Sequence, residues 1–254
     1  MASKELKAAL EAVQAAAEVI NGFYRKNPQV RTKPDQSPVT EADERAEDVI
    51  RTTLARHFPG YGFYGEESGQ HAMSAESIWL VDPIDGTKSF VREQPFFSTQ
   101  IALMRQGELV LGVSNASAYG ELAWAERGGG AFLNDQAVRV STLGQLQEAF
   151  VSTGNMESLT RAPLWERFGA LVRRVARIRG YGDFVHYHLL MRGALDVVIE
   201  TDINILDIAA LTVLVREAGG TFTDLEGAPV GLGTRSVLAT NGPLHAEVLA
   251  ALRR

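Results

Sequence analysis

The segment WLVDPIDGTKSF, residues 79–90, ends an apolar run with two carboxylates, Asp82 and Asp85, on either side of a proline. An apolar run followed at once by Gly86 and Thr87 is typical of a buried strand that ends in a turn. Two carboxylates at close range repel each other, and their removal from water is costly unless a positive charge lies between them. The segment therefore predicts a source of positive charge at this strand end.

The composition of the 254-residue chain is that of an ordinary globular protein, with 45% hydrophobic and 22% charged residues. The absence of cysteine excludes disulfides, cysteine-ligated zinc and cysteine nucleophiles, and we expect a cytoplasmic location. The formal net charge of −6 argues against nucleic acid as the main ligand. No apolar run approaches the roughly 20 residues that span a bilayer, so we expect no membrane association.

Hydrophobic periodicity predicts both hairpins and alternating helices and strands, which favours an α/β protein of stacked layers. The segment 31–40 is rich in turn-forming residues and predicts a loop or hairpin. Helices are predicted over 4–26, from Thr40 to Phe58, and over 162–173, 183–192 and 207–218. Strands are predicted over 62–64, 78–82, 97–104, 109–115, 121–126, 148–153, 175–179, 195–200 and 220–224.

Further acidic residues recur where predicted strands end and predicted helices begin. Asp43 lies in the first turn of the second helix, Glu66 and Glu67 follow a short apolar strand, and Asp207 begins a helix. Each has a simple structural alternative: a favourable helix N-terminus for Asp43, a solvated loop for the glutamates, and an N-cap for Asp207.

Taken together, these acidic residues predict a metal cluster. Strand ends and helix starts are where open α/β layers place their sites. Carboxylates without cysteine or paired histidines are hard ligands, suited to Mg²⁺ or Mn²⁺, and Asp82 is placed to bridge two ions. Such a cluster polarises phosphoryl oxygens and activates water. A short helix beginning at Gly86 and Thr87 would offer free N–H groups to a phosphate, and the Thr87 hydroxyl would orient the attacking water.

Five segments follow one another along the chain: KPDQSPVTEAD (33–43), GEES (65–68), DPIDGTKSF (82–90), RGYGD (179–183) and ETDINILDIAA (200–210). Together, in this order, they resemble the inositol monophosphatase family of lithium-sensitive, metal-dependent phosphatases. The resemblance implies a layered αβαβα sandwich of the inositol monophosphatase / fructose-1,6-bisphosphatase type, usually a homodimer. It implies one domain over residues 1–254, with most metal ligands in the N-terminal half (1–145). The C-terminal half (146–254) would carry the substrate-side residues and the last metal ligand.

The resemblance also implies a metal-ligand set. Glu66, Asp82 and the backbone carbonyl of Ile84 would hold one Mg²⁺, and Asp82, Asp85 and Asp207 a second. A third, weaker ion would lie near Glu66 and Asp43, and Mn²⁺ is a possible substitute. The family commonly has tryptophan before its last metal-binding aspartate, where this chain has leucine, so the wall beside that ligand departs from the pattern.

For catalysis, the resemblance implies that Asp43 and Thr87 activate the nucleophilic water, with Glu66 beside them, and that no phosphoenzyme forms. Gly86 and Thr87 would hold the phosphate. The chain contains no G-x-S-x-G nucleophile elbow and no Walker motif, so a serine hydrolase and a P-loop kinase are set aside.

The second half of the chain resembles the histidinol-phosphatase branch of the family, with YGDF (181–184) as the distinguishing piece. An acidic lining from Asp183, Glu200 and Asp202 would suit the cationic amine and imidazole of histidinol phosphate. Asp183 has a helix N-cap as its alternative, and Arg179 is either a substrate contact or a structural ion-pair partner. We expect the histidines at 186 and 188 to be surface or packing residues, since positions i and i+2 do not share a helical face.

The interpretation is a Mg²⁺-dependent phosphomonoesterase that acts on a small phosphate ester, with histidinol phosphate as the preferred substrate. The alternatives are an inositol-1-monophosphatase and a broad-specificity sugar or nucleotide phosphatase. A non-catalytic regulatory member of the family is a further alternative, against which the complete acidic set argues.

Overall fold

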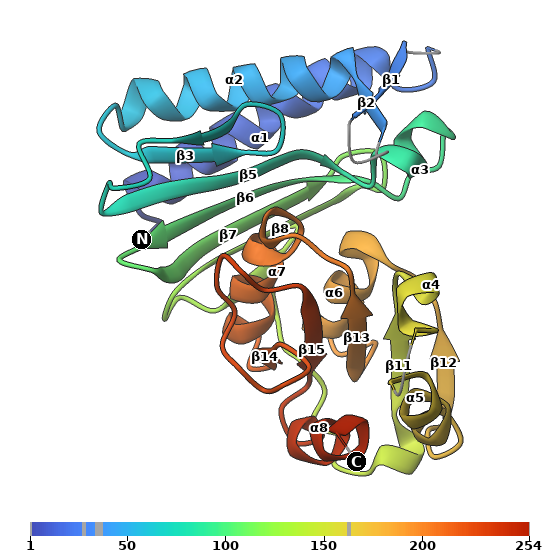
Figure 1. Ribbon diagram of the computed structural model, residues 1–254. Helices are drawn as coiled ribbons and strands as arrows, with labels where there is room; N and C mark the ends of the chain where they lie inside the picture. The colour runs from blue at the N-terminus through green and yellow to red at the C-terminus, as the bar shows by residue number, and fades with distance from the viewer. Residues whose placement is uncertain (1, 27–28, 34–37, 162–163, 254) are drawn as a thin grey trace.

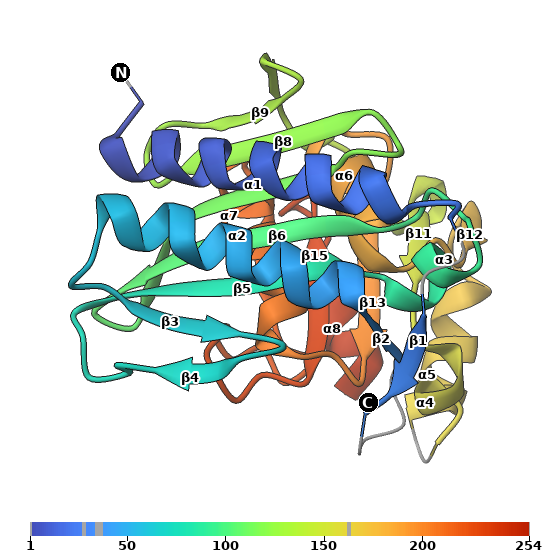
Figure 2. The ribbon, with the colours of Figure 1, turned by 90° about the horizontal axis from the view of Figure 1, so that it is seen from above.

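Helices and sheets alternate in five layers in the computed structural model, which describes residues 2–26, 29–33, 38–161 and 164–253 (Figure 1). Helices α1 (Lys4–Phe23) and α2 (Glu41–His57) form the first layer and lie side by side across the first sheet (Figure 2). Helices α6 (Asp183–Met191) and α7 (Ile205–Glu217) lie between the two sheets. The last layer holds α4 (Met156–Leu159), α5 (Leu164–Val172) and α8 (His245–Arg253). The predicted αβαβα sandwich is confirmed.

The first sheet has eight strands in the order β10-β9-β8-β7-β6-β5-β3-β4. Its central strand β5 is buried along its whole length, which matches its nearly continuous apolar sequence. The strands are β3 (Gly62–Gly65), β4 (Gly69–His71), β5 (Ser77–Asp85), β6 (Ser98–Arg105), β7 (Glu108–Ala116), β8 (Glu121–Glu126), β9 (Ala131–Leu133) and β10 (Gln136–Val138). A separate hairpin of β1 (Val30–Thr32) and β2 (Pro38–Thr40) occupies the segment predicted as a loop or hairpin.

The second sheet has five strands in the order β12-β11-β13-β15-β14. They are β11 (Phe150–Thr153), β12 (Arg177–Arg179), β13 (Val197–Thr201), β14 (Thr221–Thr223) and β15 (Ser236–Thr240), preceded by a 3₁₀ turn at Leu146–Glu148. Along β13 the side chains alternate between two apolar clusters: Val198 packs with α6 and α7, whereas Val197 and Ile199 pack with α5 and α8. Both faces of the sheet are therefore covered.

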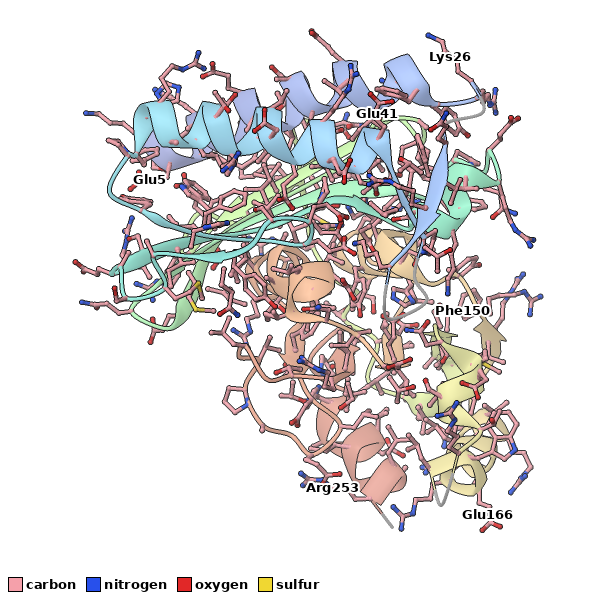
Figure 3. The ribbon with its side chains drawn as sticks, turned by 45° about the horizontal axis from the view of Figure 1, so that its top comes forward. Glu5, Lys26, Glu41, Phe150, Glu166 and Arg253 are labelled. Carbon is pink, nitrogen blue, oxygen red and sulfur yellow. The ribbon has the colours of Figure 1, made fainter. Side chains whose placement is uncertain are left out.

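Side chains fill the space between the layers, and charged residues such as Lys26 and Glu166 extend outward (Figure 3). Helix α7 approaches the first sheet without an intervening side chain at one point. A Cβ added to Gly112 on β7 would lie 2.3 Å from the Ala210 carbonyl oxygen on α7. The glycine therefore sets how closely the middle helical layer meets the sheet. In the part of the chain that the structure describes, no helix combines the length and apolar character that crossing a membrane requires.

Candidate metal and phosphate site

Three carboxylates, two on β5 and one on α7, meet at the end of β5. One oxygen each of Asp82, Asp85 and Asp207 lies within 4.8 Å of the others. Residues three apart in a regular strand point to opposite faces, but β5 is irregular here. Asp82 pairs with Gln100 and Asp85 with Ser98, so β5 contains one extra residue that brings both carboxylates to one face.

The electrostatics of this cluster favour a bound cation. Burial, together with the charges of nearby carboxylates, raises the pKa values of Asp82 and Asp85 well above their usual range. Burial and the charges of Glu66 and other carboxylates raise the pKa of Asp207 to about 7. A set of carboxylate oxygens without sulfur or imidazole, two of them on buried residues and one on the half-buried Asp207, fits a hard divalent cation such as Mg²⁺. The residues present therefore fit the metal that the sequence predicts.

The turn after β5 is held by its own polar groups. The Ile84 N–H donates to Asp82 Oδ1 at 3.0 Å, and the Thr87 hydroxyl donates to the Ile84 carbonyl at 3.0 Å. Gly86 has a φ of +89°, and a Cβ there would lie 2.6 Å from the Phe96 carbonyl oxygen, so only glycine fits. The short helix α3 (Thr87–Val91) then begins, as predicted, beside the acidic cluster.

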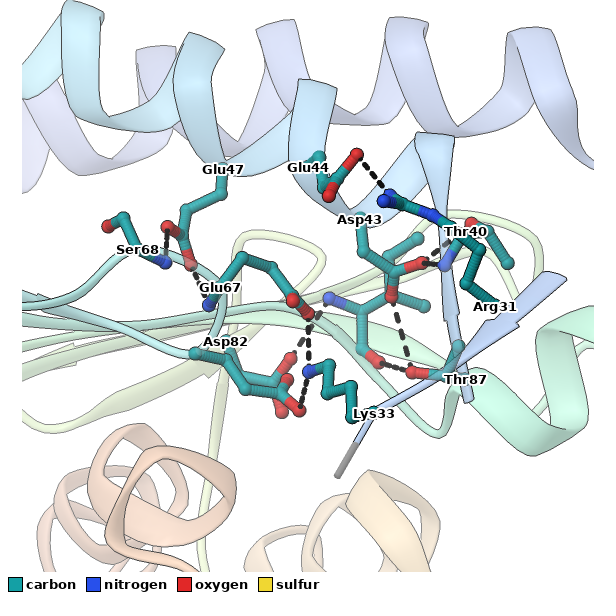
Figure 4. Close-up of polar contacts among 12 residues, drawn as sticks. Arg31, Lys33, Thr40, Asp43, Glu44, Glu47, Glu67, Ser68, Asp82 and Thr87 are labelled. Carbon is teal, nitrogen blue, oxygen red and sulfur yellow. Dashed lines mark hydrogen bonds and ion pairs between the residues drawn. The ribbon is translucent and has the colours of Figure 1, made fainter. Parts of the chain in front are cut away.

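Asp43 and Thr87 meet as the sequence predicts. Asp43 Oδ1 accepts a hydrogen bond from Thr87 Oγ1 at 3.2 Å, which joins the starts of α2 and α3 (Figure 4). Asp43 Oδ2 accepts from the backbone N–H and the hydroxyl of Thr40, at 2.7 and 2.6 Å. Asp43 is thus part of a helix capping box and a site residue at once. Burial raises its pKa.

Lys33 supplies a positive charge to the two glutamates that follow β3. Its ammonium lies 2.9 Å from Glu66 Oε1 and 2.7 Å from Glu67 Oε1 (Figure 4). Glu47 accepts the backbone N–H groups of Glu67 and Ser68 at 2.8 and 2.7 Å, which fixes the course of this loop. Burial raises the pKa of Glu67 to about 7, and the two glutamates raise that of Lys33. The residues 34–37 of the matching motif lie outside the described part of the chain.

A cavity of about 40 Å³ joins the metal carboxylates to residues from the second half of the chain. Asp85 and Asp207 line it together with Asp183 and Glu200. Burial, with the charge of Glu200, raises the pKa of Asp183 to about 6. The other lining residues are Asn155, Tyr187, Ile203, Ile208 and Leu211.

The structure excludes the helix N-cap alternatives for Asp183 and Asp207. The N-cap of α6 is Gly182, and no side chain caps this helix, so Asp183 is not the cap. The N-cap of α7 is Asn204, and Asp207 is the third helical residue rather than the first. Asp207 Oδ2 accepts the Asn204 N–H at 2.8 Å, which leaves its other oxygen for the cluster.

Two residues predicted on the substrate side lie elsewhere. Arg179 is exposed on β12, where its guanidinium donates to the Ile178 carbonyl at 2.7 Å. Asp202 is exposed before α7. Neither is among the residues that line the cavity.

Of the two alternatives for His186 and His188, surface or packing residues, the structure supports packing, because both are buried. His186 Nε2 lies 3.2 Å from Glu200 Oε2, and the Tyr187 hydroxyl donates to the same oxygen at 2.8 Å. His188 turns the other way, toward Ser114 on β7. The sequence does contain one signal for these contacts. Residues 186–188 are three consecutive side chains that can form hydrogen bonds, within an otherwise apolar helix.

Comparison with known proteins agrees with this geometry. The model of the inositol monophosphatase family matches residues 1–254. A histidinol-phosphatase from Mycobacterium tuberculosis is 41% identical, over 99% of this chain and 99% of that protein. An inositol-1-monophosphatase from Mesorhizobium japonicum is 36% identical, over 95% of this chain and 94% of that protein. Among solved structures, the extragenic suppressor protein suhB from Bartonella henselae has a TM-score of 0.90 at 32% identity, covering 99% of both chains. The chain belongs to the inositol monophosphatase family.

Proposed function

We propose that the protein is a Mg²⁺-dependent phosphomonoesterase that hydrolyses L-histidinol phosphate to L-histidinol and phosphate. The observation that carries the proposal is the cavity in which Asp183 and Glu200 lie beside the metal carboxylates Asp85 and Asp207. Metal ligands account for the phosphate end of a substrate, and two further carboxylates favour a cationic group at the other end. The three histidinol-phosphatases among the similar proteins support this choice.

In this proposal, Glu66, Asp82 and the Ile84 carbonyl would hold one ion. Asp82, Asp85 and Asp207 would hold a second, and a third would lie near Glu66 and Asp43. The bound ions supply positive charge to the phosphoryl oxygens and activate water. Mn²⁺ is a possible substitute for Mg²⁺.

The chain's own residues orient the reaction. The Thr87 hydrogen points to Asp43 Oδ1 and the Ile84 carbonyl, so the lone pairs of Thr87 Oγ1 are available to a water. The proton of this water would pass to Thr87 Oγ1 while the Thr87 hydrogen passes to Asp43 Oδ1, so Asp43 would hold the proton at the end of the step. The first backbone amides of α3, at Gly86 and Thr87, bind the phosphate of the substrate, since N-terminal amides have no partner within a helix.

The test of the substrate is phosphate release from L-histidinol phosphate and from inositol 1-phosphate, measured side by side with Mg²⁺. We expect kcat/KM to favour histidinol phosphate by at least a hundredfold, about 2.7 kcal/mol of differential transition-state binding. Asp183→Asn should reduce this preference, and Asp202→Asn, an exposed acid outside the cavity, is the matched control. Equal or reversed preference would replace the proposal with an inositol-1-monophosphatase or a broad-specificity phosphatase.

The variant Asp82→Asn distinguishes a catalytic protein from a purely regulatory one. The proposal requires that this change, or removal of metal with EDTA, abolishes phosphate release, and that Mg²⁺ restores the chelated wild-type enzyme. Activity that survives full chelation would contradict the mechanism.

Three further expectations belong to the same proposal: a homodimer, a cytoplasmic location and inhibition by Li⁺ at the ion held by Asp82, Asp85 and Asp207. Sedimentation velocity tests the first, fractionation of cells the second, and a Li⁺ titration of phosphate release the third.

A further inference from the structure

A buried network of hydrogen bonds begins at the carboxylate of Asp85 on β5 and runs from strand to strand through β6 to β7. Ser98 Oγ donates to Asp85 Oδ2 at 3.4 Å. Gln100 Nε2 donates to Ser98 Oγ at 2.7 Å and to Ser114 Oγ at 3.1 Å. His188 Nε2 lies 3.0 Å from Ser114 Oγ. We call Ser98, Gln100, Ser114 and His188 the Ser98–His188 network.

The network ends at an ion pair near the surface. His188 Nδ1 lies 2.9 Å from Glu121 Oε2, and Arg192 Nη1 donates to Glu121 Oε1 at 2.7 Å. A continuous path of polar side chains therefore joins α6 to the metal site, although His188 itself does not line the cavity.

The Ser98–His188 network is fully buried. Each of its four residues is at most 1% exposed. Ser98 and Gln100 lie two residues apart on β6, so their side chains share one face of the sheet. Gln100 pairs directly with Ser114 on β7, which places the third side chain beside them. Buried polar groups cost free energy unless they are paired, and apolar side chains would fill this space without that cost. A role in the adjacent site explains their presence better than stability does.

One arrangement of the hydrogens accounts for every contact of the network, with Gln100 Oε1 as the buried atom that it leaves without a partner. The Glu121 carboxylate only accepts, so His188 donates from Nδ1. Burial lowers the pKa of His188, so its ring is neutral and Nε2 accepts the Ser114 hydrogen. Both hydrogens of the Gln100 amide then go to Ser114 and Ser98, and the Ser98 hydrogen is left for Asp85.

We propose that His188 is a positioning residue for the metal ligand Asp85 and acts through Ser114, Gln100 and Ser98. By accepting the Ser114 hydrogen, His188 holds the Gln100 amide in the orientation that turns the Ser98 hydroxyl toward Asp85. The inference rests on the metal site of the proposed function. It adds His188, which does not line the cavity, to the residues that influence how tightly that site binds metal ions.

The test is the dissociation constant of Mn²⁺ for the phosphate-free protein, measured by electron paramagnetic resonance. Ser98→Ala and His188→Asn should each weaken Mn²⁺ binding about tenfold, the lower end of what outer-shell partners contribute. In His188→Asn, the asparagine amide reaches the position of His188 Nδ1, so it keeps the hydrogen bond to Glu121 and loses the one to Ser114. The amide of glutamine reaches the position of Nε2, so His188→Gln should keep the affinity within about twofold because the Ser114 contact survives.

The double variant Ser98→Ala/His188→Asn separates a network from two independent losses. If both residues act along one path, the double variant loses about tenfold, not about a hundredfold. Thr212→Val is the matched control, since it removes a buried hydroxyl that donates to the Ile208 carbonyl outside the network. It should leave Mn²⁺ affinity unchanged.

The outcomes are distinct. Unchanged affinity in Ser98→Ala and His188→Asn, or equal loss in Thr212→Val, would overturn this inference alone. A wild-type protein that takes up no Mn²⁺ would overturn the metal site and the proposed function with it. If His188→Asn does not fold, Ser114→Ala breaks the same path and carries the same expectation.

Discussion

Glu200 accepts two hydrogen bonds at a single carboxylate oxygen, Oε2, from the buried side chains of Tyr187 and His186. Its other oxygen, Oε1, lies against Gly154, where an added Cβ would come within 2.0 Å. The carboxylate is therefore confined on both sides before any ligand arrives. A group held in place beforehand loses little entropy on binding, which favours Glu200 as the recognition residue for a cationic substrate.

Tyr187→Phe removes one donor to Glu200 and keeps the ring, whose centroid lies 5.6 Å from that of Phe222. Loss of a hydrogen bond to a charged group should lower the free energy of unfolding by about 1.5–3 kcal/mol. We expect KM for histidinol phosphate to rise several-fold while kcat changes little. Inositol 1-phosphate is the control substrate, and an equal rise in its KM would show that Tyr187 has only a structural role.

At the scale of elements, two helices place site carboxylates in the same way. Asp43 and Asp207 are each the third residue of a helix, and each closes a capping box with the N-cap residue, Thr40 or Asn204. One oxygen of each carboxylate thus bonds the N-cap backbone and the other is available to the site. The start of a helix fixes both the element and the position of its functional group.

The two capping boxes allow a matched prediction. Thr40→Ala and Asn204→Ala each remove a capping side chain and should lower the free energy of unfolding by about 1 kcal/mol. Only Thr40 also donates its hydroxyl to the site carboxylate, so only Thr40→Ala should reduce kcat. Urea unfolding and phosphate release measure the two effects. Equal losses of kcat would show that helix fraying, rather than the bond to Asp43, matters.

The elements that the sequence predicts are those with long periodic segments. The long helix over 4–26 ends at Phe23, and the hairpin over 97–115 becomes β6 and β7. The three-residue strands β4, β9 and β10 escaped prediction and form by pairing with their neighbours in the first sheet. The strands β12 and β14 are as short, but they lie within the longer segments predicted over 175–179 and 220–224. The strand β15 and the helix α8 also went unpredicted.

The site was predictable where one motif holds several of its residues, as in the segment 82–87. The bulge that turns both aspartates to one face is a property of pairing with β6, so sequence alone does not contain it. The contacts of His186 and His188 were missed for a similar reason. They reach residues on other elements, Glu200 and Ser114, and helical spacing says nothing about those distances.

At the scale of the whole molecule, the metal site opposes stability when no ion is bound. Two buried carboxylates and the half-buried Asp207 repel one another, so Asp207→Asn should raise the unfolding temperature of the metal-free protein at neutral pH. The same change should remove most of the further rise that Mg²⁺ gives the wild type, because binding to the folded state alone stabilises it. Thermal scans with EDTA and with Mg²⁺ measure both. A metal-free variant less stable than wild type would contradict the prediction.

Stability should also depend on pH through His188. Burial lowers its pKa from the usual 6.5, so the unfolded chain binds a proton more readily than the folded one. This contribution to stability is present above pH 6.5 and is lost as the pH falls below it. The difference in unfolding free energy between wild type and His188→Gln should therefore shrink from pH 7.5 to about 5.5. Urea titrations at several pH values measure it, and a constant difference would contradict the assignment.

The contact of Gly112 with Ala210 has a consequence for the choice of ion. Asp82 and Asp85 belong to the sheet and Asp207 to α7, so the separation of these two layers sets two sides of the triangle that the three carboxylates form. Mg²⁺ needs oxygens at about 2.0–2.1 Å, whereas Ca²⁺ accepts about 2.3–2.6 Å. A methyl group at position 112 would lift the helix and widen the triangle toward the larger ion. In the proposed site, Gly112 would thus influence which ion fits, although the atoms nearest to an added Cβ there belong to Ala210 and not to the three carboxylates.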